Sequence, residues 1–370
     1  MKSICFIGLD NYSVLNPNSG LKYIGGESVQ QTLLAKAFVT LGYQVKMIVE
    51  DCGQPDGEII SGIEVIKAFR KRAGVRGVRY FYPRITSLSK AILRADADVY
   101  YWSCAGMEVG LIAVIARIRN KKFVYRVASD SDCERGKQLI KFWHDRKIFE
   151  FGLGHVSMIA AQSIRQVELL RSSYGLKSVA VNMVVEPLAD SKEIMKDIDL
   201  IWVNNVRKLK RPEMFLQLAC ALPEFRFVMI GGPYPGMSEY YNEINQSAKT
   251  INNLELLGAI PYDDVNKYIE RSKLFVNTSE MEGFPNSFLQ AWVRGVPVVS
   301  FFDPDSLIKM HGLGMAPDGF GEMISGVKSL LDDKQRRSNV SLKARAFSAD
   351  RYDPRKVAMK YVELLKKESS

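Results

Sequence analysis

The chain has few of the residues that build metal sites or disulfide frameworks. Its three histidines are widely separated in the sequence, so a histidine-based metal site is not expected. The five cysteines have no paired spacing, which favours a reducing compartment and argues against structural zinc. No apolar run approaches the roughly 18 residues that span a bilayer, and the chain opens with a predicted strand rather than a signal peptide. We therefore expect a cytoplasmic protein with no metal or other cofactor.

The length and the rhythm of the sequence predict an α/β protein of two domains. With 370 residues, 47% of them apolar, the chain can form two separate cores. Short β-branched runs alternate with amphipathic helical stretches, as in doubly wound parallel sheets. A charged break near residues 186–197 predicts a linker. We expect domains at residues 1–187 and 188–351, and a terminal helix at 352–370 that returns to the first domain.

Residues 273–302, KLFVNTSEMEGFPNSFLQAWVRGVPVVSFF, are the most informative stretch. Residues 274–278 predict a buried strand, and the loop after it carries the carboxylate of Glu282. Pro285 and Asn286 are expected to open and cap the next helix. Open α/β sheets bind ligands at the carboxyl ends of their strands, and helix N-termini attract anionic oxygens. This pattern suits a ligand with both phosphates and hydroxyls, such as a sugar nucleotide.

The helix after this loop carries a polar stripe with two interpretations. Asn286, Gln290 and Arg294 recur every four residues and therefore share one face. A solvated stripe is the simpler interpretation for an arbitrary helix. The neighbouring carboxylate and helix start favour a ligand-binding stripe instead.

The segment EGFPNSFLQAW resembles the donor motif of retaining GT-B glycosyltransferases, which include relatives of glycogen and sucrose synthase and many bacterial polysaccharide enzymes. In that family a Glu contacts the donor sugar, and a second Glu, after seven intervening residues, contacts the ribose. Glu282 matches the first, whereas Gln290 stands at the second, where an amide can still accept a ribose hydroxyl. The resemblance spans nearly the whole chain and is strongest at residues 199–304.

This resemblance implies two Rossmann-like domains facing a central cleft and a glycosyl transfer that retains the anomeric configuration without a metal. The implied donor is a nucleoside-diphosphate sugar, most simply of UDP or GDP type. The implied acceptor is a glycan or a lipid-linked glycan in cell-surface polysaccharide or glycolipid biosynthesis. A catalytically inactive nucleotide-sugar-binding or scaffold protein of the same fold is the alternative.

Residues 205–212 are expected to meet the donor diphosphate, because they follow a predicted strand and hold four cations in five positions. The family has an Arg and then a Lys here. Lys210 matches the Lys, Asn205 occupies the usual Arg position, and Arg207 is the candidate replacement. Glu282, Lys210 and Arg207 are therefore the expected catalytic residues, and Lys208 and Arg211 are expected to be solvated.

Further donor contacts are implied by the family's glycine loops and main-chain contacts. For the glycine pair Gly25 and Gly26, a plain turn is an equal interpretation on local grounds. Many relatives carry a His near the donor sugar, but residues 103–106 contain none, and the acidic residues at 130–132 either line the cleft or form turns. The implied donor-binding residues are Gly25, Gly26, Asn205, Gly231, Gly232, Ala259, Ile260, Gly283, Phe284, Pro285, Asn286, Ser287 and Gln290.

Residues 67–94 contain nine Lys or Arg residues, no Asp or Glu, and several aromatic residues. A solvated basic face and a surface for anionic lipid headgroups or a lipid-pyrophosphate acceptor are the two main interpretations. Nucleic-acid binding is not expected, because no nucleic-acid module accompanies the run. The net charge of +10 favours an anionic partner, which places the protein peripherally at the inner face of a membrane. The expected surface residues are Arg70, Lys71, Arg72, Arg76 and Arg79.

Overall fold

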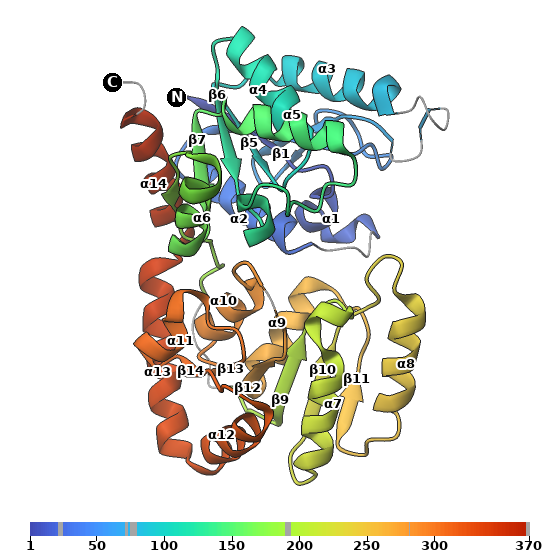
Figure 1. The fold of residues 1–370 in the computed structure, drawn as a ribbon, viewed down its shortest axis with the longest axis vertical. Helices are drawn as coiled ribbons and strands as arrows, with labels where there is room; N and C mark the ends of the chain where they lie inside the picture. Colours follow the sequence, from blue (N-terminus) through green and yellow to red (C-terminus); the bar gives the residue numbers. More distant parts are fainter. Residues whose placement is uncertain (21–24, 71–72, 75–79, 189–193, 281, 368–370) are drawn as a thin grey trace. The chain divides into compact units, whose positions relative to one another are not determined.

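The computed structural model describes residues 1–20, 25–70, 73–74, 80–188, 194–280 and 282–367 (Figure 1). The chain forms two compact units, one made of Met1–Val184 with Pro354–Ser370 and the other of Val185–Asp353. The boundary lies a few residues before the predicted position of 187–188, and within the second unit the Val185 amide donates to the Tyr352 carbonyl. Each unit contains one sheet with its own helices.

The first unit contains a sheet in the order β3-β4-β2-β1-β5-β6-β7-β8, parallel except for the β3–β4 pair. Its strands are β1 Ser3–Ile7, β2 Gln44–Val49, β3 Ile59–Ile60, β4 Ile63–Lys67, β5 Val99–Ser103, β6 Lys122–Arg126, β7 Met158–Ala161 and β8 Val179–Ala180. Its helices are α1 Tyr12–Leu15, α2 Gly26–Thr40, α3 Thr86–Ala95, α4 Glu108–Ile118, α5 Trp143–Leu153, α6 Ile164–Tyr174 and α14 Pro354–Lys367, with shorter helical turns at Pro17–Ser19, Tyr80–Ile85 and Asp130–Cys133.

Helices cover both faces of this first sheet, because its strands are apolar on both sides. One face packs against α3, α4, α5 and α6, with Tyr100 and Tyr125 in its core (Figure 1). On the other face α2 and α14 lie together. There the Phe6 and Tyr101 rings stack at 4.9 Å, and Tyr101 meets Tyr361 of α14 at 5.9 Å. The terminal helix is thus part of the core of the first unit.

The second unit contains a fully parallel sheet in the order β11-β10-β9-β12-β13-β14. Its strands are β9 Ile198–Val203, β10 Phe227–Ile230, β11 Leu254–Leu256, β12 Ser272–Asn277, β13 Val298–Ser300 and β14 Gly314–Met315. Its helices are α7 Pro212–Ala221, α8 Ser238–Ala248, α9 Tyr262–Glu270, α10 Asn286–Val293, α11 Leu307–His311, α12 Phe320–Asp332 and α13 Lys334–Arg351, with short turns at Lys208–Lys210 and Pro304–Ser306. In chain order this is the 3-2-1-4-5-6 arrangement of a doubly wound domain.

The core of the second unit also has two sides. Trp202 of β9 and Phe215 of α7 lie on the side covered by α7, α8 and α12. On the other side Phe275 of β12 meets Phe288 of α10, whose ring in turn packs on Trp292 at 5.7 Å. Helix α10 is therefore anchored by a row of buried aromatic rings, which holds its N-terminus in place.

Helix α4 does not follow β5 directly. It begins at Glu108, five residues after the end of β5 at Ser103. Cys104 has φ of 74°, a left-handed conformation that interrupts a helix, and its carbonyl accepts from Trp102 Nε1 at 2.9 Å. The residues before Glu108 are therefore a turn.

Candidate functional site

The candidate site lies where the strand order of the second unit reverses. From β9 the chain runs first to β10 and β11 on one side and then to β12, β13 and β14 on the other. The loops that leave the carboxyl ends of β9 and β12 lie at this reversal, which is where open α/β sheets bind ligands. The cation loop follows β9, and the loop that carries Glu282 follows β12.

Hydrogen bonds tie these two loops together. Trp202 Nε1 donates to Thr278 Oγ1 at 3.0 Å, and that hydroxyl donates to the carbonyl of Lys210 at 2.8 Å. The Glu280 amide donates to the Leu209 carbonyl at 3.1 Å. The backbone of Lys210 is therefore held by the strand next to its own, a relation that spacing in the sequence does not reveal.

Lys210 and Glu282 form an ion pair across the two loops. Their side chains are only 8% and 10% exposed. Burial lowers the pKa of the Lys210 ammonium, the Glu282 carboxylate opposes this shift, and the positive charge of Arg207 adds to it. The structure thus brings together all three residues predicted to be catalytic.

Arg207 is half-buried and lies over an aromatic ring that the sequence analysis did not identify. Its guanidinium carbon is 5.1 Å from the centre of the Tyr234 ring, a cation–π distance. The Val206 amide donates to the Gly232 carbonyl at 2.8 Å, which brings the Tyr234 loop alongside. Arg207 Nε is buried and has no hydrogen-bond partner among the described residues, so it remains a donor for an anion.

The glycines after β10 allow the loops after β9, β10 and β11 to meet. Gly231 has φ of 154°, and a Cβ there would lie 1.7 Å from the Asn204 carbonyl oxygen. A Cβ on Gly232 would lie 2.9 Å from that of Ala259. Asn205 and Ala259 are exposed at this edge, and Ile260 is half-buried beside them. Bulkier residues at either glycine would separate loops that the site needs together.

The start of α10 differs from the prediction. Pro285 is the N-cap, Asn286 is the first helical residue, and no side chain caps the helix, so the predicted capping role of Asn286 is wrong. Asn286 Oδ1 is instead buried without a hydrogen-bond partner in the described part of the chain. Ser287 and Gly283 are half-buried nearby. The Phe284 ring points inward, 6.4 Å from Trp292, so only its main chain is available to a ligand.

Gln290 is buried one turn further along α10, and one of its groups is already engaged. Its Nε2 donates to Asn266 Oδ1 of α9 at 2.9 Å. This bond fixes the orientation of the carboxamide and leaves its oxygen and its second N–H outside it. Asn266 was not identified from the sequence, because nothing in its spacing links α9 to α10.

Gly25 and Gly26 lie in the first unit, at the start of α2. Gly25 is the N-cap and accepts from the Val29 amide at 3.2 Å. Glu27 follows in the first turn, where burial raises the pKa of its carboxyl and the Arg126 charge opposes the shift. A carboxylate beside the glycines makes this edge of the first unit less suited to phosphate than the cation loop of the second.

The acidic loop after β6 is a turn with a capping role. The Asp132 carboxylate accepts from the Ala128 and Ser129 amides at 3.3 and 3.2 Å, completing a capping box with Ser129. Burial raises the pKa of Asp132 to about 6. Asp130 pairs with Arg165 at 3.3 Å. Both carboxylates are thus used within the first unit.

Most of the predicted basic surface lies outside the described residues, including Lys71, Arg72, Arg76 and Arg79. Arg70 is exposed and pairs with Asp51 at 3.1 Å, a carboxylate that also pairs with Lys67. Phe69, one of the interleaved aromatic residues, belongs to the core. Carboxylates from the preceding loop therefore balance part of this run, which the composition of residues 67–94 alone could not show.

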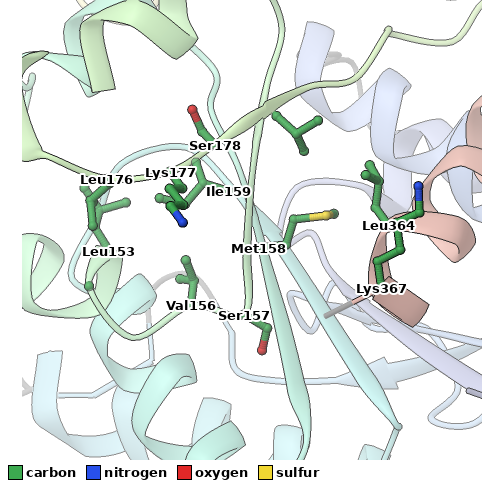
Figure 2. A pocket seen from close by; sticks show the side chains of 12 residues that line it. Leu153, Val156, Ser157, Met158, Ile159, Leu176, Lys177, Ser178, Leu364 and Lys367 are labelled. Carbon is green, nitrogen blue, oxygen red and sulfur yellow. The ribbon is translucent and has the colours of Figure 1, made fainter. Parts of the chain in front are cut away.

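A shallow pocket in the first unit lies at the opposite edge of its sheet, at the amino ends of β7 and β8 beside α14 (Figure 2). Ligands of doubly wound sheets bind at the carboxyl edge, so this pocket is not the candidate site. Its lining is mostly apolar, with Lys177 and Lys367 at its margin.

The described residues contain no cluster of three or more His, Cys, Asp or Glu side chains placed to hold a metal ion. Within the same described ranges, every helix is too short or too polar to cross a bilayer.

The sequence of the second unit matches a known family. Residues 186–347 match the profile described as "Glycosyl transferases group 1", which is most of this unit and less than half of the chain. The matched segment contains the Lys210–Glu282 pair, the glycines after β10 and the whole of α10. This match supports the glycosyltransferase that the motif predicted.

Solved structures show the GT-B fold over the whole chain. Sucrose-phosphate synthase from Thermosynechococcus elongatus superposes with a TM-score of 0.76 at 14% identity, covering 99% of both chains. HepE from Anabaena in complex with UDP-glucose gives 0.72 at 13%, covering 99% of both. A glycosyltransferase from Rickettsia africae gives 0.69 at 12%, covering 100% of this chain and 98% of the other. No curated protein sequence matches the chain significantly.

Proposed function

We propose that the second unit binds a nucleoside-diphosphate sugar at the carboxyl ends of β9 and β12 and that the enzyme transfers the sugar to an acceptor with retention. The observation that carries this proposal is the buried Lys210–Glu282 pair, located at the switch point of the sheet and inside the family match. A buried ion pair is weak support for stability, since its desolvation offsets its attraction. Ligand binding would explain why the protein has this buried pair.

The diphosphate would be held by Lys210, by Arg207 and by the free amides at the start of α10. Arg207 Nε is a buried donor that lacks a partner in the described ranges, and phosphate oxygens would supply one. As the anomeric C–O bond breaks, negative charge develops on the leaving diphosphate, and these fixed cations stabilise it. The protein's own charges thus supply the stabilisation that the reaction requires, and no step calls for a metal.

Glu282 would accept hydroxyls of the donor sugar, and Asn286 Oδ1 is a second buried acceptor without a described partner. The Gln290 oxygen would accept a hydrogen bond from a ribose hydroxyl. The bond from Gln290 Nε2 to Asn266 holds the carboxamide in the orientation for this contact. Main-chain groups of Ala259 and Ile260 would meet the base. HepE binds UDP-glucose, which supports a UDP-sugar as the first donor to test.

The acceptor would be a glycan or lipid-linked glycan of cell-surface polysaccharide or glycolipid biosynthesis, approached from the first unit. The basic residues at 70–79 would attract its anionic groups. The enzyme would then work peripherally at the inner face of a membrane.

Thermal shift with a panel of UDP- and GDP-sugars tests the donor assignment. A ligand at 100 times its Kd stabilises the native state by about 2.7 kcal/mol, so one class of donor should raise the melting temperature clearly. Lys210→Ala should reduce the shift, whereas Lys208→Ala, an exposed cation of the same loop, should keep it. Absence of any shift contradicts the proposal. A shift without transfer to any glycan or lipid-linked acceptor would favour the inactive binding protein.

A further inference from the structure

Large apolar side chains are exposed along one segment of the first unit, the α5 face, whose members are Leu139, Phe142, Trp143, Ile148 and Phe151. Leu139 is 89% exposed and Trp143 is 74% exposed. Exposed apolar side chains are normal when scattered singly, but a group of this kind marks an interaction site. None of these residues belongs to the candidate donor site.

The packing of α5 explains why this face points outward. Phe149, Gly152 and Leu153 are buried on the inner side of the helix. A Cβ on Gly152 would lie 2.5 Å from the Gly110 amide nitrogen, so α4 and α5 cross in direct backbone contact. This close crossing fixes the rotation of α5. Phe151 therefore lies on the outer side, whereas Ile148 lies at its margin, because a Cβ on Gly110 would be 2.5 Å from Ile148 Cγ2.

The charges around the α5 face are arranged with cations outermost. Lys147 has a side chain that is 71% exposed, whereas its partner Glu150 is 13% exposed. Lys137 is likewise more exposed than its partner Glu134. The Lys141 ammonium lies 5.4 Å from the centre of the Phe142 ring, so cation and aromatic ring share one surface. A partner of this face would meet apolar rings and positive charges together.

We propose that the α5 face docks on an anionic lipid bilayer, with Phe142, Trp143 and Phe151 at the level of the headgroups. Trp143 favours this depth, because its ring system can be buried while the indole N–H stays wet, and the two Phe rings add apolar area. The lysines would pair with lipid phosphates. A second copy of the chain fits less well, since an isologous contact would bring together two faces that both have cations outermost. This docking does not depend on the donor or on the reaction.

Cosedimentation with vesicles tests the proposal through two variants and two matched controls. Phosphatidylcholine vesicles with and without phosphatidylglycerol are the probe. Each cation near an anionic surface is worth about 1 kcal/mol, which is about fivefold in affinity, so three together give about 100-fold. The variants are Phe142→Ser with Trp143→Ser, and Lys137→Gln with Lys141→Gln and Lys147→Gln. The controls, exposed residues of the second unit, are Met310→Ser with Leu342→Ser, and Lys249→Gln with Lys328→Gln and Lys334→Gln.

The wild type should bind the anionic vesicles at low salt, detach as salt rises, and ignore the neutral ones. The lysine variant should lose about 100-fold in affinity and the aromatic variant at least tenfold, with both controls unchanged. No binding by the wild type, or equal losses in the controls, would overturn the proposal. So would a wild-type dimer that the aromatic variant dissolves, because the face would then join two copies.

Trp143 gives a second measurement that needs no variant and therefore no folding control. Of the four tryptophans, all of them described, Trp202 and Trp292 are fully buried and Trp102 is half-buried. Anionic vesicles with brominated acyl chains should quench the emission of the exposed Trp143. Unchanged emission on bound vesicles would show that docking uses another surface. Loss of binding in Arg70→Gln with Lys71→Gln, Arg72→Gln and Arg76→Gln, with the lysine variant unaffected, would assign it to the basic span instead.

Discussion

The two units share one architecture and use the carboxyl edges of their sheets differently. In the first unit, Arg126 at the end of β6 donates to the Val181 carbonyl at 2.9 Å and to the Tyr361 hydroxyl at 2.8 Å. The Arg126 guanidinium thus helps to hold α14 against the first sheet. In the second unit, Arg207 rests on Tyr234 and keeps a buried donor without a partner in the described ranges. The same edge therefore stabilises the fold in one unit and stays available to a ligand in the other.

This contrast shows why strand order alone does not identify a function. Both sheets are doubly wound, and both have a helix N-terminus and an arginine at the edge. Both edges leave a buried polar atom without a partner in the described ranges: Glu27 Oε1 in the first unit and Arg207 Nε in the second. In the second unit this atom belongs to a cation near the Lys210–Glu282 pair, and residues 186–347 match the family profile. The kind of unsatisfied group, a cation rather than a carboxyl, therefore distinguishes the two edges.

The largest expected effect comes from Glu282→Ala, which would remove a sugar contact at the carboxyl edge of the second sheet. Loss of one preorganised contact costs about 2–4 kcal/mol in transition-state binding, or roughly two to three decades in kcat/KM. Steady-state transfer kinetics measure it. Glu280→Ala, an exposed carboxylate in the same loop, is the matched control. Equal activity of the Glu282→Ala variant and the wild type would refute the assigned role.

The fold of the Glu282→Ala variant also needs a check. Glu282 lies in a loop, where a substitution often leaves the fold intact. The structure pairs it with a buried ammonium, so the variant leaves Lys210 unpaired and should melt at a lower temperature. Glu282→Gln keeps a hydrogen-bond acceptor and separates stability from catalysis.

The next prediction concerns the pH dependence of stability in the first unit. The pKa of Asp132 is about 6, against about 3.9 in an unfolded chain. Between these values the folded state binds more protons, so the free energy of unfolding falls by about 3 kcal/mol as pH rises from about 4 to about 6. Urea unfolding should show this slope in the wild type and in Ser131→Ala, and its loss in Asp132→Asn. A slope that persists in Asp132→Asn contradicts the assignment.

Lys210→Ala tests phosphate binding by the second unit. A hydrogen bond to a charged group contributes about 1.5–3 kcal/mol, so the affinity for a nucleoside diphosphate should fall about 10- to 150-fold. The affinity for the free nucleoside should change little. Isothermal titration of both ligands measures the difference. Equal losses for both ligands would mean that Lys210 does not touch phosphate.

The smallest effect concerns Tyr234, which positions Arg207. An exposed cation–π contact is worth about 0.5–1 kcal/mol, so Tyr234→Ala should weaken nucleoside-diphosphate binding about two- to fivefold. Tyr234→Phe keeps the ring and should bind as the wild type does. If Phe and Ala weaken binding alike, the hydroxyl rather than the ring would be the contributing group.

Much of the site was predictable because its residues follow strands within short loops. Glu282, Gly283 and Lys210 lie directly after buried apolar runs, and parallel strands bring such loops to one edge. Tyr234 and Asn266 were not predictable, since they reach the site from β10 and α9 through contacts between loops. The capping role given to Asn286 failed because Pro285 itself occupies the N-cap.

The fold was predictable where apolar runs are long, and less so at the edges of the sheets. The edge strands β3 and β14 have two residues each, too few to show a period. Helix α13 was missed because only Ala344 and Ser348 are buried, so the apolar stripe that marks a helix is absent. Helix α8 was also missed, since its buried residues are few among polar ones.

The Lys210–Glu282 pair has a further consequence under the proposed function. Glu282 acts as a built-in counter-ion, so the charge of Lys210 is balanced within the protein. An arriving diphosphate would exchange one anion for another and release the carboxylate towards the sugar. Because an anion replaces an anion, nucleoside-diphosphate affinity should depend only weakly on salt. The order of events would also be set: phosphate first, sugar recognition second.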